Sequence, residues 1–251
     1  YTGIGSNLFT VIDKFIGHWR GGLAIATEVA CAGFGAICGS APATSGTMCA
    51  VAYPEMRKNG YSPTIAGPAI AAGANLAALI PPSATFIIYG LACDTSIGSL
   101  FVAGIVPGIL LTLCFALLIW VMASRHPELA PASPKATWAE RKYALVHGSV
   151  IEVAIIFLLS MGGMFAGLFT PTEAGAIGAF GVLVITMVTR KLNFKKFIDS
   201  LGASVRLQAM VFVLIACATV FSRFLAVSTI PVKVGTYVKT LLAGGVPQLA
   251  I

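Results

Sequence analysis

The sequence predicts an all-α polytopic membrane protein in which two helical segments are broken within the bilayer. Apolar residues make up 57% of the chain and charged residues 10%, against about 45–50% and 25% in soluble domains. Long apolar runs follow one another, and Gly, Ser and Pro interrupt two of them. Lys and Arg lie between the runs, which is typical of loops that stay in the cytoplasm.

Charge and cysteine content exclude other classes of protein. The net charge is +7, but the basic residues lie between apolar runs, so a cytoplasmic face and anionic lipid explain them and no nucleic acid partner is expected. The six cysteines fall almost wholly inside apolar runs and form no CxxC pair or Cys/His cluster. They indicate small packing residues and neither a zinc site nor a disulfide framework.

The first element, residues 1–21, contains an amphipathic stretch at 6–19. Its apolar residues recur at helical spacing opposite Asp13, Lys14 and Arg20. This pattern predicts an arm helix that lies in the membrane interface. A short cytoplasmic helix packed on protein is the alternative.

Residues 22–123 are predicted to form a first repeat. Residues 22–53 are broken at 39–46, and roughly 15 residues on either side reach only about 22 Å, less than the ~30 Å apolar core of a bilayer. Residues 64–90 form a second broken helix, and residues 99–123 suit one spanning helix. A polar, basic stretch follows, and we expect a cytoplasmic linker at 124–147.

The basic clusters set the predicted topology. They are Arg57-Lys58, the stretch from Arg125 to Lys142, and the stretch from Arg190 to Lys196. Two spans separate each cluster from the next, so all three fit the cytoplasmic side, as does Arg20. Only residues 22–53 separate Arg20 from Arg57, so this segment is predicted to enter and leave by the same face as a re-entrant hairpin. Two compressed spans are the alternative.

Residues 148–251 are predicted to begin a second, inverted repeat. Residues 148–168, 172–189 and 207–226 each suit one span, and 232–243 are mildly amphipathic. Residues 2–25 align without gaps on 228–251, and the topology puts the first copy inside and the second outside. Inverted pairs of this kind underlie many secondary transporters. The chain starts at Tyr1 and stops in apolar sequence, so we expect a fragment truncated before a second hairpin.

The interruption GSAPATSG at residues 39–46 is the first candidate site. Non-helical backbone at membrane depth is costly unless it lines a cavity or holds an ion. Hydroxyl and carbonyl oxygens are hard ligands that suit Na⁺, and a helix N-terminus after the turn favours an anionic group. We predict a sodium and substrate site at Gly39, Ser40, Ala43 and Thr44, with Na⁺ bound by Ser40, Thr44 and nearby carbonyls. A proline kink satisfied by packing is the alternative.

The second interruption is predicted to complete this site. Pro81 and Pro82 remove two backbone donors and free carbonyls one turn earlier. Asn75, Ser83 and Thr85 place further oxygen atoms nearby. Broken helices that face each other at mid-membrane are how secondary transporters bind substrate and coupling ions.

Three weaker candidates are Glu28, Thr172 and Glu173. Glu28 lies in the first arm of the hairpin, where a carboxylate is costly and by default functional. A place near the interface, paired with Arg20 or a lipid headgroup, is equally open. Thr172 and Glu173 follow Thr170 in a pattern that helix capping explains fully, and a ligand role is the alternative.

Four motifs carry a resemblance to a known family: GGLAIATEVACAGFGAICGSAPATSGTM, YPEMRKNGYSP, AAGANLAALIPPSATFIIYG and GLFTPTEAGAIGAFGVLV. In order and spacing, over essentially the whole chain, they resemble the large membrane subunit of tripartite ATP-independent periplasmic (TRAP) transporters. Family members are longer at both ends, so the chain looks like their middle portion. Their hairpin tips usually carry Gly-Ser-Ser and a small residue, whereas Ala41 and Pro42 follow Ser40 here. Asn75 stands where the family more often has a small residue or Thr.

The resemblance implies an elevator-type importer in the bacterial inner membrane, with Na⁺ as coupling ion and no organic cofactor. Its expected substrates are organic acids such as sialic acid or C4-dicarboxylates, delivered by a periplasmic binding protein. A small membrane subunit is the expected partner in the bilayer. The hairpin and the 64–90 helix are expected to move together as the transport part, joined to a scaffold by the arm at 6–19. A stand-alone ion-coupled anion transporter is the alternative.

Other function classes fit the sequence less well. An enzyme needs an acid, base, nucleophile or metal held at depth, but the histidines His18, His126 and His147 lie at loop edges, and no HExxH or Ser/His/Asp arrangement exists. No GxxxxGK[ST] loop is present for ATP. A channel or scaffold subunit is less favoured, because channel filters usually come from symmetric rings of subunits. The sequence therefore favours an ion-coupled transporter.

Overall fold

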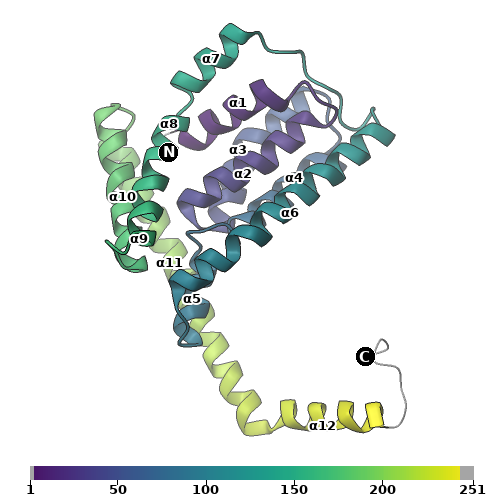
Figure 1. The fold of residues 1–251 in the computed structure, drawn as a ribbon, viewed down its shortest axis with the longest axis vertical. Helices are drawn as coiled ribbons and strands as arrows, with labels where there is room; N and C mark the ends of the chain where they lie inside the picture. The colour runs from purple at the N-terminus through teal and green to yellow at the C-terminus, as the bar shows by residue number, and fades with distance from the viewer. Residues whose placement is uncertain (1–2, 244–251) are drawn as a thin grey trace. The chain divides into compact units, whose positions relative to one another are not determined.

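The computed structural model describes residues 3–243, which form helices joined mostly by short connections, with a longer one between Arg125 and Trp138 (Figure 1). The chain divides into two compact units, one that runs to Lys191 and one that begins at Leu192. The helices of the first unit are α1 (Ile4–Ile16), α2 (Gly22–Cys38), α3 (Ala41–Lys58), α4 (Pro63–Leu76), α5 (Ala84–Ala92), α6 (Ile97–Arg125), α7 (Trp138–His147), α8 (Val150–Phe157), the π-helical turn η1 (Leu158–Gly162), α9 (Gly163–Phe165) and α10 (Pro171–Val188). The second unit contains α11 (Phe194–Ser228) and α12 (Ile230–Ala243).

Within the described residues, three helices are long and apolar enough to cross a membrane: α6, α10 and α11. The number is four if α7 and the bent helical run after it are counted as one span. On α6, Leu110, Leu113 and Leu117 are at least 60% exposed. A continuous apolar surface of this kind is unfavourable in water and matches the hydrocarbon of a bilayer. The chain is an all-α integral membrane protein.

The core of the first unit lies between α1, α2, α3, α4 and α6, which pack side by side (Figure 1). Every residue of α2 from Gly22 to Glu28 is buried, as expected for a helix surrounded by other helices. Met48 and Met56 of α3 and Ile70 of α4 are buried against it. This core connects both broken segments through shared apolar contacts.

Both interruptions predicted from the sequence are breaks between helices. α2 ends at Cys38, Gly39 is left-handed with φ +59°, and Ser40 is the N-cap of α3. α4 ends at Leu76, and α5 begins directly after its N-cap, Ser83. The order of helix, break and helix in residues 22–53 and 64–90 agrees with the sequence analysis. Entry and exit of the hairpin by one membrane face stay a prediction.

The helical run at 148–168 is shorter than predicted. α8, η1 and α9 follow one another without a gap from Val150 to Phe165. At 1.5 Å per residue this run is about 24 Å long, less than the ~30 Å apolar core of a bilayer. It ends because the chain turns at Gly167, which is left-handed with φ +75°, before Thr170 begins α10.

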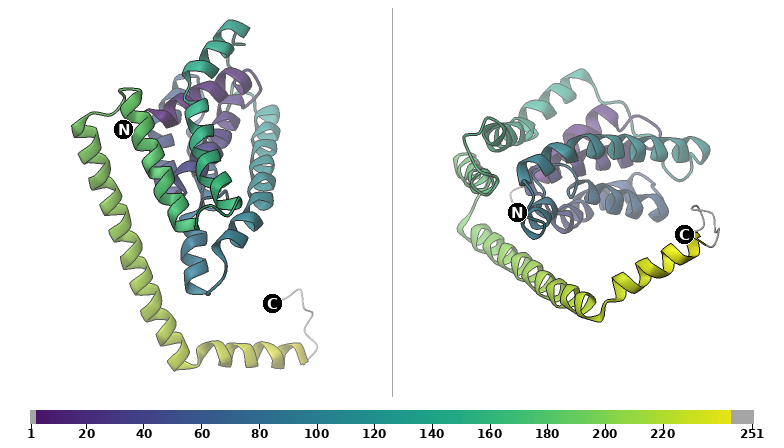
Figure 2. Two further views of the ribbon diagram at one scale, coloured as in Figure 1. Left: turned by 60° about the vertical axis from the view of Figure 1, so that its left-hand side comes forward. Right: turned by 60° about the horizontal axis from the view of Figure 1, so that its bottom comes forward.

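The helix that contains the predicted span 207–226 is longer than predicted. α11 is one uninterrupted helix of 35 residues (Figure 2), about 52 Å long. No proline interrupts residues 194–228, and Gly202 lies inside the helix, so the polar stretch around Lys195 and Arg206 continues directly into the apolar stretch that follows. The helix is therefore longer than the thickness of the apolar core of a bilayer.

The two copies of the predicted internal repeat begin with helices at aligned positions. The alignment places α1, which begins at Ile4, on α12, which begins at Ile230. The residue before each helix is left-handed, Gly3 with φ +79° and Thr229 with φ +56°. Residues 244–251 of the second copy lie outside the described residues, and the inverted orientation stays a prediction.

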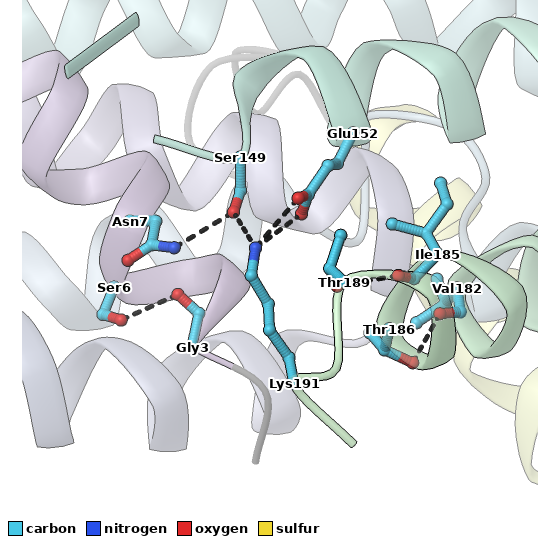
Figure 3. A network of polar contacts seen from close by, with 10 residues as sticks. All are labelled: Gly3, Ser6, Asn7, Ser149, Glu152, Val182, Ile185, Thr186, Thr189 and Lys191. Carbon is cyan, nitrogen blue, oxygen red and sulfur yellow. Dashed lines mark hydrogen bonds and ion pairs between the residues drawn. The ribbon is translucent and has the colours of Figure 1, made fainter. Parts of the chain in front are cut away.

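A polar network joins α1, the start of α8 and the end of the first unit (Figure 3). Lys191 Nζ donates to Glu152 Oε1 at 2.9 Å and to Ser149 Oγ at 3.1 Å, and Asn7 Nδ2 donates to the same hydroxyl at 3.0 Å. The side chains of Lys191 and Glu152 are only 28% and 21% exposed. The Asn7–Ser149 hydrogen bond therefore joins α1 to the start of α8, and the partly buried ion pair joins Lys191 to α8.

Tyr61, in the connection between α3 and α4, is fully buried and holds the start of α2. Its hydroxyl oxygen accepts a hydrogen bond from Leu23 N–H at 3.1 Å. Leu23 lies in the first turn of α2, where backbone donors have no partner within the helix. The Tyr61 hydroxyl therefore satisfies a donor that otherwise has no acceptor in this core.

We expect Tyr61→Phe to reduce the free energy of unfolding by about 1–3 kcal/mol, because the buried Leu23 N–H loses its acceptor. Tyr89→Phe is the control, since the Tyr89 side chain is 54% exposed. Thermal unfolding of the purified protein in detergent measures both variants. An unchanged melting temperature for Tyr61→Phe would contradict the role assigned to its hydroxyl.

Candidate functional site at the helix breaks

The two helix breaks lie directly against each other. The Gly39 carbonyl accepts a hydrogen bond from Ala84 N–H at 3.0 Å. A Cβ added to Gly39 would lie 2.4 Å from the Pro82 carbonyl oxygen. One turn earlier, a Cβ on Gly35 would lie 2.7 Å from Ala77 Cα. The structure thus brings the tip at 39–40 and the break at 77–83 into contact, so the two broken helices face each other.

At the tip, short-range hydrogen bonds fix the predicted hydroxyl ligands. Ser40 Oγ accepts from Ala43 N–H at 3.4 Å, and Thr44 Oγ1 donates to the Ser40 carbonyl at 2.9 Å. Thr44 is fully buried. Its hydroxyl has one proton and donates it here, so the oxygen lone pairs remain able to bind a cation. Gly39, Ser40, Ala43 and Thr44 form one compact group.

Cys38 belongs to this group, although its place in an apolar run predicts a packing residue. Its Sγ atom lies 3.2 Å from Thr44 Oγ1 and 3.7 Å from the Ser40 carbonyl oxygen. A half-buried thiol therefore touches both predicted sodium ligands. In the sequence, its position directly before the Gly-Ser turn was the one feature that could have indicated this contact.

The second break is held by Ser83 and by glycines of α6. Ser83 Oγ donates to the Ala78 carbonyl at 2.7 Å, one of the acceptors that lose their helical partner because proline has no N–H. A Cβ on Gly104 would lie 2.5 Å from the Leu79 carbonyl oxygen, and one on Gly108 would lie 2.8 Å from Ile80 Cγ1. Irregular backbone therefore fits against α6 only where α6 has no side chain.

Helix ends of opposite polarity meet at the breaks. In the described chain, no N–H outside α2 bonds the carbonyls at its C-terminal end, those of Ala36, Ile37 and Cys38. Carbonyls at a helix C-terminus carry partial negative charge and favour a cation. α3 and α5 begin beside this end, and the first N–H groups of a helix favour an anion. A cation and an anionic group can therefore bind side by side here.

Other predicted residues lie at the edge of this arrangement or outside it. Asn75 is exposed in the last turn of α4, and its Nδ2 donates to the Ala71 carbonyl at 3.0 Å. Thr85 is exposed in the first turn of α5, while Pro81 is buried. Within residues 3–243, no hydrogen bond joins Asn75 or Thr85 to the tip at Ser40.

The Thr-Pro-Thr-Glu sequence forms the helix start that capping chemistry predicts. Glu173 Oε2 accepts from Thr170 N–H at 2.8 Å, and Glu173 N–H donates to Thr170 Oγ1 at 3.3 Å, which is a capping box. Thr172 is exposed in the same turn. The structure gives Glu173 a structural role, and it does not place Thr172 or Glu173 at the two breaks.

Glu28 lies inside the helix packing of the first unit. It is fully buried, and neither carboxyl oxygen has a hydrogen-bond partner within the described chain. Arg20 is exposed, and the Arg20–Glu28 pair that the sequence left open does not form in the described chain. The reason is the close packing of α2, which buries Glu28 on the side facing α4.

Comparison with known proteins identifies one family over the whole chain. Residues 1–251 match the family described as the tripartite ATP-independent periplasmic transporter, DctM component. The ectoine/5-hydroxyectoine TRAP transporter large permease protein of Ruegeria pomeroyi is 35% identical over 228 residues, which cover 90% of this chain and 52% of that protein. The C4-dicarboxylate TRAP transporter large permease protein of Pseudomonas aeruginosa is 32% identical over 240 residues, with coverages of 95% and 55%.

A third relative is the 2,3-diketo-L-gulonate TRAP transporter large permease protein of Escherichia coli. It is 33% identical over 241 residues, which cover 96% of this chain and 56% of that protein. The chain thus spans about half the length of the curated relatives it matches.

We expect Gly39→Ala to destabilise the contact between the breaks, because a left-handed Ala costs roughly 1–2 kcal/mol and its Cβ collides with the Pro82 carbonyl. Gly46→Ala is the matched control, since Gly46 lies within α3 and a Cβ there meets nothing within 4 Å. Replacement of Gly by Ala in a helix interior stabilises the folded protein by about 1 kcal/mol. Melting temperatures of the two variants should move in opposite directions. A Gly39→Ala variant as stable as wild type would show that the tip does not need glycine.

Proposed function

The chain belongs to the family of the DctM component of tripartite ATP-independent periplasmic transporters, and we propose that it forms part of a sodium-coupled importer of organic acids in the bacterial inner membrane. The observation that carries this proposal is the contact between the two broken helices. Their ends place negative and positive backbone charge side by side, as co-transport of Na⁺ and an anion requires.

Na⁺ binds, in this proposal, at the C-terminal end of α2. The available ligands are the Thr44 and Ser40 hydroxyl oxygens and the unbonded carbonyls of Ala36, Ile37 and Cys38. Hydroxyl and carbonyl oxygens are the ligand type that hard cations prefer. The partial negative charge of this helix end adds to the attraction.

The substrate's acidic group binds at the start of α3 and α5. In the described structure, the N–H groups of Ala41 and Thr85 donate to no other group, while Ser40 and Ser83 cap the next donors of each helix. Relatives are named for C4-dicarboxylates, ectoine and 2,3-diketo-L-gulonate. Each of these molecules carries a carboxylate, which is the group that free N–H donors at a helix start bind.

The core supports a transport part that moves as one body. α2, α3 and α4 share one set of buried side chains, so the two breaks cannot separate without exposing that core. α1 packs on α2 and α3 and also on α7 and α8, which suits an arm between mobile and fixed parts. The elevator motion proposed here is a shift of α2–α6, which corresponds to the predicted first repeat at 22–123, relative to the remaining spans.

The partners follow from the family. Its description names a tripartite, periplasmic system, so we propose a small membrane subunit and a periplasmic binding protein that delivers the acid. In proteoliposomes holding the complete natural protein with both partners, we expect uptake of labelled organic acids only with an inward sodium gradient and the binding protein. Uptake without the binding protein would indicate a stand-alone transporter, and uptake without sodium would refute the coupling.

Removal of one proposed ligand should weaken sodium binding specifically. We expect Thr44→Val to raise the sodium concentration for half-maximal uptake by about tenfold, which corresponds to about 1.4 kcal/mol of binding free energy. Thr47→Val is the matched control, because its hydroxyl also bonds a carbonyl within α3, that of Ala43 at 2.8 Å, one turn further on. Equal sodium dependence of both variants would exclude Thr44 as a ligand.

A further inference from the structure

A buried carboxyl group lies in the α2–α4 interface, away from the helix breaks. Glu28 is 0% exposed, and both of its carboxyl oxygens lack a hydrogen-bond partner within residues 3–243. A Cβ added to Gly73 of α4 would lie 2.8 Å from Glu28 Oε2 and 3.0 Å from Cys31 Sγ. The carboxyl group therefore fills the space that Gly73 leaves on α4.

The elements around Glu28 offer no charge that compensates a carboxylate. α4 contains no ionisable residue, and on α2 itself the nearest ionisable group is the Cys31 thiol. The ionisable residues of the other helices packed on α2 are Asp13 and Lys14 of α1, Cys49, Tyr53, Glu55, Arg57 and Lys58 of α3, Cys114 and Arg125 of α6, and Glu152 of α8. None of them forms a hydrogen bond or ion pair with Glu28 in the described chain.

The cations among these residues are engaged elsewhere or exposed. Arg57 donates to the Tyr61 carbonyl, Lys58 and Arg125 are exposed, and Lys14 lines a surface groove between α1 and α7. An ionised carboxylate in this position would be buried without a counterion, the least favourable state for such a group. A neutral carboxylic acid avoids that state.

A metal ion is a poor substitute for a proton at this position. Na⁺ needs several oxygen ligands, but α2 carries a single side-chain hydroxyl, that of Thr27. Gly73, Cys31 and the surrounding small residues supply no further side-chain oxygen. A proton needs only the carboxylate itself.

We infer that Glu28 is a proton-binding site in the α2–α4 interface, occupied whenever the two helices pack as they do here. Proton binding forms one O–H bond on the carboxylate, with the proton taken from water. Separation of α2 from α4 hydrates the group and lets it ionise, so a rise in pH favours separation and a fall in pH favours packing. This inference goes beyond the proposed sodium coupling and does not depend on it.

The test is the pH dependence of stability in the complete natural protein in detergent, with Glu28→Gln as isosteric variant. Melting temperatures are compared at roughly pH 6 and pH 9.5, since buried Glu residues are documented to titrate at about pH 8–9. We expect the wild type to lose several degrees at the higher pH and Glu28→Gln to lose clearly less. Asp13→Asn and Cys31→Ala are the controls: Asp13 has one buried carboxyl oxygen without a partner, and Cys31 is the neighbouring titratable group. Both should keep the wild-type pH dependence.

Two results would overturn the inference. One is an equal loss of stability in wild type and Glu28→Gln. The other is recovery of the wild type at high pH by added NaCl but not by KCl, absent in Glu28→Gln, which would assign the site to Na⁺. If Glu28→Gln fails to fold, infrared spectra of wild type and Glu28→Asp decide. A protonated-carboxyl band at neutral pH that shifts in Glu28→Asp supports the proton, and no such band refutes it.

Discussion

The arrangement of the candidate site depends on one hydrogen bond, from Ala84 N–H to the Gly39 carbonyl. It joins the end of α2 to the start of α5, and it forms only because Gly39 has no side chain to displace the Pro82 carbonyl. In a membrane, an unpaired backbone group has no water to bond, so each break supplies what the other lacks. Through this bond two irregular segments, each costly alone, form one polar site inside an apolar core.

Small residues allow this site and its surroundings to pack at close range. Gly35 meets the backbone of Ala77, Gly73 meets Glu28, and Gly104 meets the Leu79 carbonyl. Helices in a bilayer gain little from burying apolar surface and associate through close van der Waals packing and hydrogen bonds. The glycines on α2, α4 and α6 are therefore placed where irregular backbone or a polar side chain needs room.

The sequence predicted what local chemistry determines. Gly39 permits a left-handed backbone, and Ser40 caps the next helix. The Pro81-Pro82 pair removes two N–H donors. Each of these effects acts within a few residues, so the sequence alone locates the breaks. It did not predict the Cys38–Thr44 contact or the burial of Glu28, because these depend on how α2 packs against α3 and α4. Apolar composition alone overestimated the length of the helix after residue 148, because the apolar sequence continues past Gly167, where the chain turns. It also underestimated α11, which extends N-terminally through a polar stretch to Phe194. The sodium ligands stay a prediction.

The two cation positions inferred here lie on one helix and yet are electrically almost separate. Glu28 and Cys38 are ten residues apart on α2, about 15 Å along the axis. At that distance, two unit charges interact by about 1 kcal/mol at an effective dielectric of about 20. A proton on Glu28 and Na⁺ near Thr44 therefore influence each other little through the field alone. Both positions depend on the packing of α2 on the 64–83 segment. Glu28 faces Gly73, and Gly35, one turn before the tip, faces Ala77. Any coupling between proton and sodium must then pass through the position of α2 against α4.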